Sequence, residues 1–222
     1  METGRTLKFS PDTPQRVVVK GYDWGMGLCT AILTLEQPAV PETVNAGIFE
    51  QVVEERESFD WATFQPEHIV IWVPRTVRDA YVCSPDGARS TQPDRYVRVE
   101  FACTPATTPA CFDLHKQRSN WCDPYHLLYT VNGETFAPPV DLNHASLPQL
   151  EPFCMEQSFT GSEGRTLKYA YYEPEDVRTA PEEKRPLVIW LHGAGEGGTN
   201  TSQPLLGNKA TALASPEFQQ AM

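Results

Sequence analysis

Basic residues, long apolar runs and paired cysteine motifs are scarce in this sequence. Lys and Arg number 18 against 29 Asp and Glu, which leaves a formal net charge of -11. This surplus disfavours nucleic acid and anionic membranes as partners, because both are polyanionic. No stretch approaches the ~18 apolar residues of a membrane span, and the first ten residues lack the apolar centre of a secretory signal. We expect no nucleic-acid or membrane partner and, by default, a cytoplasmic protein; an extracellular one stays open if the natural N-terminus is missing.

The six cysteines form no C-x-x-C pair, so we expect no metal site. Cys29 and Cys103 alternate with apolar residues, which is typical of small core side chains. Cys111 and Cys122 lie in a turn-rich stretch and are the better candidates for a loop-closing disulfide. The sequence leaves the redox state of all six open.

The stretch "WCDPYH" puts Cys122, Asp123 and His126 close together in the chain and invites a metal or Cys-His site. Pro124 blocks the helix that would bring Cys122 and His126 onto one face. We therefore favour a turn that leads into the next strand.

Long helical periodicity is missing from the first ~150 residues, where strand signals recur at the spacing of a sandwich. The 20 prolines also favour short elements separated by turns. Residues 137–152 carry four prolines outside any periodic pattern, as in a connector. We predict an all-β sandwich over residues 1–150, with strands at Gln15–Lys20, Leu28–Glu36, Ile48–Glu54, His68–Val73, Val77–Cys83, Tyr96–Cys103 and Tyr125–Val131.

Five aromatic residues of this half admit two interpretations. They could form a carbohydrate-facing platform, as in many appended β-modules, but core packing explains them at least as well. The residues are Tyr22, Trp24, Phe59, Trp61 and Phe64.

Residues 151–222 have a different pattern. Met155–Thr160 and Arg165–Tyr172 are expected as strands joined by the turn "GSEG". Pro186–Leu191 is continuously apolar after its proline, as in a strand buried on both faces of a parallel sheet. A helix is expected over Pro204–Ala214, with Ser202 as its cap. This order is typical of the start of an α/β domain.

The glycine loop after that apolar run supports two hypotheses. Gly193, Gly195 and Gly198 fit G-x-G-x-x-G, which cradles a dinucleotide pyrophosphate where a helix starts within the motif. Five polar residues, 199–203, delay the helix, and His192 is unusual at the end of such a strand. The alternative is an oxyanion hole, in which backbone N–H groups of a sharp turn stabilise a developing negative charge. We favour the second hypothesis and expect no cofactor.

"PLVIWLHGAGEGG" resembles the loop after strand 3 of α/β-hydrolases. Residues 171–200 are similar to the predicted peptidase and esterase group near the polyhydroxybutyrate depolymerases, whose members carry H-G-A-G-E. Some of these enzymes have an N-terminal immunoglobulin-like module, and "VKGYDWGMGLCTAILTL" is similar to one. The resemblance implies that Ala194 and Gly195 offer oxyanion N–H groups, Gly193 permits the turn and His192 shapes the loop without acting as the base. A small ester or peptide is the implied substrate.

An α/β-hydrolase also needs a G-x-S-x-G nucleophile elbow, followed by an acid and a histidine. None follows Gly198 in this chain, and no histidine follows His192. The resemblance therefore implies an immunoglobulin-like sandwich at 1–150 and an N-terminal fragment of a serine hydrolase domain at 151–222. We expect the chain alone to be inactive and the apolar strand to have unpaired edges on both sides. The alternatives are a β-sandwich module that binds carbohydrate or self-associates into a homo-oligomer and, less favoured, a nucleotide-binding oxidoreductase.

Overall fold

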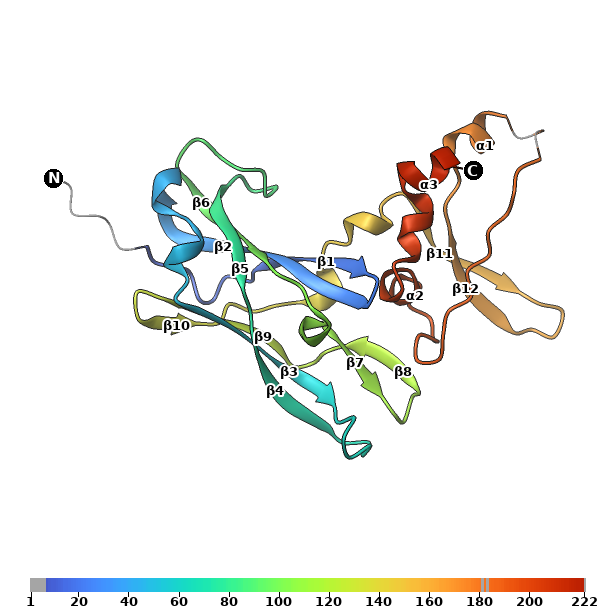
Figure 1. The fold of residues 1–222 in the computed structure, drawn as a ribbon, viewed down its shortest axis with the longest axis horizontal. Helices are drawn as coiled ribbons and strands as arrows, with labels where there is room; N and C mark the ends of the chain where they lie inside the picture. Colours follow the sequence, from blue (N-terminus) through green and yellow to red (C-terminus); the bar gives the residue numbers. More distant parts are fainter. Residues whose placement is uncertain (1–6, 181, 183, 222) are drawn as a thin grey trace. The chain divides into compact units, whose positions relative to one another are not determined.

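The computed structural model describes residues 7–180, 182 and 184–221 (Figure 1). The chain divides into two compact units, each described by itself below. The first comprises Met1–Val19, Gly27–Cys111 and Trp121–Ser146, and the second Lys20–Met26, Phe112–Asn120 and Leu147–Met222. Among the described residues, no helix is long and apolar enough to cross a membrane.

Two four-stranded antiparallel sheets build the first unit, which is mostly β structure (Figure 1). The first sheet has the order β1-β2-β6-β5 and the second the order β10-β9-β3-β4. The strands of the first sheet are β1 (Arg16–Tyr22), β2 (Gly25–Ala39), β5 (Val77–Cys83) and β6 (Asp94–Phe101). Those of the second are β3 (Gln51–Phe59), β4 (His68–Pro74), β9 (Tyr125–Val131) and β10 (Glu134–Phe136).

The central strands β2 and β6 both carry apolar residues of the core: every second residue is buried in β6, whereas almost every residue is buried in the first half of β2. In β2, Ala31 and Leu33 are fully buried, and in β6 Val97 and Val99 lie opposite them in register. The prediction for Cys29 is confirmed, since its side chain is buried on this face. Cys103 follows the end of β6 and is only half-buried, and its thiol donates to a backbone carbonyl of β2 at 3.3 Å.

The second sheet carries a buried ionic cluster that the sequence pattern does not reveal. Glu54 is fully buried and accepts hydrogen bonds from the guanidinium groups of Arg56 and Arg75 and from the Tyr125 hydroxyl. Arg75 also donates to the carbonyl of Leu28 in β2, at 2.6 Å. Burial raises the pKa of Tyr125 well above its ordinary value. Arg75 thus joins the cluster to the first sheet. Burial of the charges is tolerated because each one has an opposite charge or a hydrogen-bond partner.

Sequence patterns located seven strands of this unit, and two of them, β5 and β9, have the expected bounds. The strand expected at Ile48–Glu54 begins later, at Gln51, because a 3-10 turn occupies Ala46–Ile48. Three short strands were missed: β10 of this unit, and β7 (Ala110–Asp113) and β8 (Arg118–Trp121), whose residues 112–120 belong to the second unit. They have only three or four residues each, too few to show an alternation.

The proline-rich stretch expected as a connector is partly paired with β1. Gln15 bridges Val140, and Val18 bridges Ser146, both in parallel orientation. The side chain of Gln15 donates to the carbonyl of Pro138 at 2.8 Å and accepts from the Tyr129 hydroxyl at 2.6 Å. Proline cannot donate to a ladder but its carbonyl can accept, which is how this stretch joins the sheet.

Two further expectations concern the cysteines and the stretch "WCDPYH". Cys111 and Cys122 were the candidates for a loop-closing disulfide, and in the structure Cys122 is a thiol. Cys122 lies in a turn, and β9 begins at Tyr125, as expected for a turn that leads into a strand. His126 is exposed while Cys122 is buried, so these two side chains build no common site.

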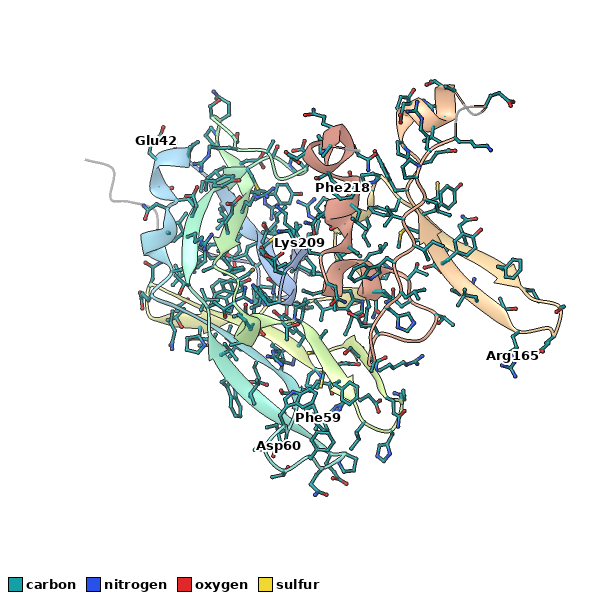
Figure 2. All side chains as sticks on the ribbon, turned by 45° about the vertical axis from the view of Figure 1, so that its right-hand side comes forward. Glu42, Phe59, Asp60, Arg165, Lys209 and Phe218 are labelled. Carbon is teal, nitrogen blue, oxygen red and sulfur yellow. The ribbon has the colours of Figure 1, made fainter. Side chains whose placement is uncertain are left out.

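The second unit contains a strand hairpin and short helices. β11 (Cys154–Thr160) pairs with β12 (Thr166–Tyr171) in antiparallel register, and Arg165 marks its turn in Figure 2. The prediction of this hairpin is confirmed. Three short α-helices follow, α1 (Glu175–Thr179), α2 (Ser202–Gly207) and α3 (Pro216–Ala221), with a 3-10 helix at Ala210–Ala214. The single helix expected over Pro204–Ala214 is wrong, because Lys209 adopts a left-handed conformation that separates α2 from the 3-10 helix.

The apolar run at 187–191 is not a strand, which corrects the expectation of a buried parallel strand. The run is extended but unpaired, and Leu187 and Leu191 are 83% and 81% exposed. A strand needs a neighbour to satisfy its backbone groups. In the described part of the chain, no strand pairs with this run.

The five aromatic residues form two separate groups. Tyr22 stacks on Trp24 with ring centroids 5.0 Å apart. Phe59 is buried and contacts the rings of Trp61 and Phe64 edge to face, while the latter two remain exposed. The rings within each group pack against one another in stacked or edge-on pairs.

Candidate functional site

The glycine loop is organised around one carboxylate, that of Glu196. Its Oε2 accepts the backbone N–H of Gly193 at 2.9 Å, and its Oε1 accepts the side-chain amide of Asn208. The N–H of Glu196 donates back to the carbonyl of Gly193 at 3.3 Å. A Cβ at Gly207 would lie 2.5 Å from Oε1, so this position leaves the space that the carboxylate occupies. Glu196 therefore ties the turn after His192 to the C-terminal end of α2.

The middle of the loop is held by the first residues of β8. Gly195 forms a parallel bridge with Arg118, and its carbonyl accepts the N–H of Ser119 at 2.6 Å. Its φ of 93° lies in the left-handed region, where glycine is favoured because it has no Cβ. A Cβ there would also come within 3.3 Å of the Phe112 ring. Gly195 is thus engaged with its neighbours through its backbone.

Ala194 differs from Gly195. It is exposed at the outer side of the turn, and within the described part of the chain its N–H donates no hydrogen bond. An exposed N–H of this kind on a braced turn can donate a hydrogen bond to an external oxygen. His192 is also exposed, and its Nδ1 lies 2.9 Å from the carbonyl of Gly193, where it can donate.

The helix after the loop begins too late to face a phosphate within the glycine motif. α2 begins at Ser202, where the Asn200 carboxamide oxygen accepts the Ser202 N–H at 3.0 Å. Ser202 is therefore the first helical residue, and the capping group comes from Asn200 instead. Gly198 lies against the Arg118 side chain, which would meet a Cβ at 2.8 Å.

Sequence reasoning named His192, Gly193, Ala194 and Gly195 but missed the residues that brace them. Glu196 stands within the H-G-A-G-E motif, which is the signal that could have identified it. Asn208, Arg118 and Ser119 carry no motif, and only the tertiary structure brings them to the loop.

Comparisons with known proteins give one informative likeness. The chain shares its fold with a thermostable esterase. The match to the solved structure titled "Crystal Structure of a Thermostable Esterase" has a TM-score of 0.59 at 19% sequence identity. It covers 93% of this chain and 54% of the esterase chain, so the present chain spans about half of that protein's length. No family model matches the sequence, and no curated protein matches it.

Proposed function

We propose that this chain is the part of a serine esterase or peptidase that carries one half of the oxyanion hole. The exposed N–H of Ala194, which has no hydrogen-bond partner among the described residues, carries the proposal, because it sits on a turn braced by Glu196 on one side and by the start of β8 on the other. Preorganisation of this kind lets a donor stabilise a developing oxyanion without rearrangement during the reaction. The esterase-like fold supports the same assignment.

In this proposal Ala194 donates to the carbonyl oxygen of a small ester or peptide as it becomes negatively charged. Gly195 is the weaker candidate, since its backbone already pairs with Arg118. Gly193 provides the turn, and His192 shapes it through contact with the Gly193 carbonyl. The nucleophile, acid and base belong to residues that this chain does not contain, in agreement with the missing G-x-S-x-G.

The immunoglobulin-like character of the first unit belongs to the same proposal. Its two antiparallel sheets are the architecture that such a module needs. We assign the module no chemistry of its own in the hydrolysis.

The test measures turnover of a p-nitrophenyl ester. Protein of this sequence is expected to give no turnover above buffer. The same chain, extended to include G-x-S-x-G and the later histidine, is expected to be active. In the extended chain Ala194→Pro removes the N–H and should lower kcat by about 10²–10³-fold.

Ala194→Gly keeps the N–H and serves as the matched control, with kcat expected within a few-fold of the parent. Two outcomes contradict the proposal: turnover by homogeneous protein of the present sequence, or an extended chain in which Ala194→Pro and Ala194→Gly behave alike.

A further inference from the structure

A second cluster of reactive side chains lies in the first unit, at the end of β3 where Figure 2 labels Phe59 and Asp60. Glu57, His68 and Cys111 each place one ligand atom so that all three atoms lie within 4.8 Å of one another. None of them takes part in the proposed hydrolase site. A carboxylate, an imidazole and a thiolate are all ligands that Zn²⁺ accepts.

Strand register brings the first two together. Phe59 pairs with His68 across β3 and β4, and Glu57 lies two residues before Phe59 on the same face of β3. Glu57 and His68 are therefore diagonal neighbours on one face of the sheet. Glu57 Oε2 lies 2.7 Å from His68 Nδ1, and both side chains remain partly exposed, at 16% and 25%.

The turn at 122–124 holds the third ligand in place. The N–H of Cys122 donates to the carbonyl of Pro109 at 2.9 Å, which fixes the start of β7 and hence Cys111. The N–H of Asp123 donates to Glu57 Oε1 at 2.8 Å. One carboxylate oxygen is thus oriented by the backbone, and the other faces His68. Metal ligands are commonly oriented by such outer hydrogen bonds.

The three side chains of the cluster differ in their exposure to solvent. Cys111 is 3% exposed, while Glu57 and His68 open toward solvent. The soft thiolate therefore lies at the buried end of the cluster, and the harder oxygen and nitrogen ligands lie at the end that solvent reaches. Three protein ligands with an open fourth position is a common arrangement of zinc in proteins.

We propose that Glu57, His68 and Cys111 bind one Zn²⁺ ion, with water as the fourth ligand. Zn²⁺ binds the neutral imidazole of His68 at Nδ1 while the imidazole proton resides on Nε2, Glu57 binds as the carboxylate, and the thiol proton of Cys111 goes to solvent. Zinc bonds of about 2.0–2.2 Å at tetrahedral angles require the N···O distance to open from 2.7 Å to about 3.3–3.6 Å. This is a small movement for two partly exposed side chains. The thiolate favours Zn²⁺ over Mg²⁺ and Ca²⁺, which prefer oxygen ligands.

The experiment titrates the full chain, reduced and stripped of metal, with Zn²⁺ in a calorimeter and with Co²⁺ in a spectrophotometer. One Zn²⁺ per chain is expected, and Co²⁺ should produce a thiolate charge-transfer band. Cys111→Ser and His68→Gln should each weaken Zn²⁺ binding by at least about tenfold. Mg²⁺ and Ca²⁺ should not compete.

Cys154→Ser is the matched control, because Cys154 is an exposed thiol of the other unit. Its zinc affinity should equal that of the parent. Circular dichroism of the metal-free variants checks that each one folds, and His68→Gln, at a partly exposed position, keeps the test decisive if Cys111→Ser misfolds. No stoichiometric Zn²⁺, or loss of binding in Cys154→Ser with Cys111→Ser unaffected, overturns the proposal. Neither outcome bears on the oxyanion loop, which lies in the second unit.

Discussion

Two apolar segments of this chain, one in each unit, differ in how deeply they are buried. In the first unit, β2 and β6 bury Leu33, Val97 and Val99 completely. In the second, Leu187 and Leu191 are almost fully exposed although their run is more continuously apolar. The difference lies in the partners: β2 pairs on both sides, with β1 and β6, whereas no described strand pairs with the run at 187–191. Apolar sequence makes a buried strand only where neighbouring strands satisfy its backbone.

The largest change in the free energy of unfolding is expected when a charged side chain is removed from the core of the first unit. Arg75→Ala leaves Glu54 buried without its guanidinium partner, which should lower the free energy of unfolding by about 3–5 kcal/mol. Urea denaturation followed by fluorescence measures the change.

Arg89→Ala is the control, since Arg89 also pairs with a carboxylate and lies over a tyrosine ring, 3.7 Å from its centroid, but is exposed. Exposed pairs contribute at most about 1 kcal/mol. Equal losses for Arg75→Ala and Arg89→Ala would show that the Glu54 cluster is not a buried charge network.

Leucine truncation tests the comparison directly. Leu33→Ala should lower the free energy of unfolding by about 2–5 kcal/mol, because it leaves a cavity in a fully buried position. Leu187→Ala should change it by less than about 0.5 kcal/mol, since the side chain makes little contact to lose. Thermal or urea unfolding of both variants measures these changes. A large loss for Leu187→Ala would mean that the run at 187–191 is packed in solution.

The smallest expected effect concerns one surface carboxylate of the second unit. Hydrogen bonds from the Lys116 side chain and backbone lower the pKa of Asp113 to about 2. A lowered pKa stabilises the folded chain above the ordinary Asp pKa, and this contribution is lost as the pH falls toward 2. Lys116→Gln should move the Asp113 pKa toward its ordinary value of 3.8. An NMR titration of the carboxyl carbon measures it, and an unmoved pKa would assign the shift to the backbone alone.

Most of the strands that could be predicted from the sequence were predicted from the local pattern of apolar and polar residues. Alternation located β5, β6 and β9 because each strand is long enough to show two faces, one buried and one exposed. The hairpin of β11 and β12 was found from its turn. Short strands such as β10, and the pairing of a proline-rich stretch with β1, leave no such trace, because they depend on which backbone groups meet in space.

The features of the candidate sites also divide into those that the sequence determines and those that the tertiary structure determines. The sequence alone determined the glycine loop, since its residue types at consecutive positions predict a sharp turn that presents N–H groups. It also determined that this chain contains no nucleophile elbow. Only the tertiary structure decided that the N–H of Ala194 donates to no described residue while Gly195 pairs with Arg118.

The cluster of Glu57, His68 and Cys111 was decided by tertiary structure altogether. The sequence favoured no metal site, because its cysteines show none of the close spacing typical of zinc motifs. These three residues come from three different strands, and antiparallel register and the turn at 122–124 bring them together. Residue pattern is a property of neighbours along the chain, whereas ligand geometry depends on strand pairing between residues far apart in it.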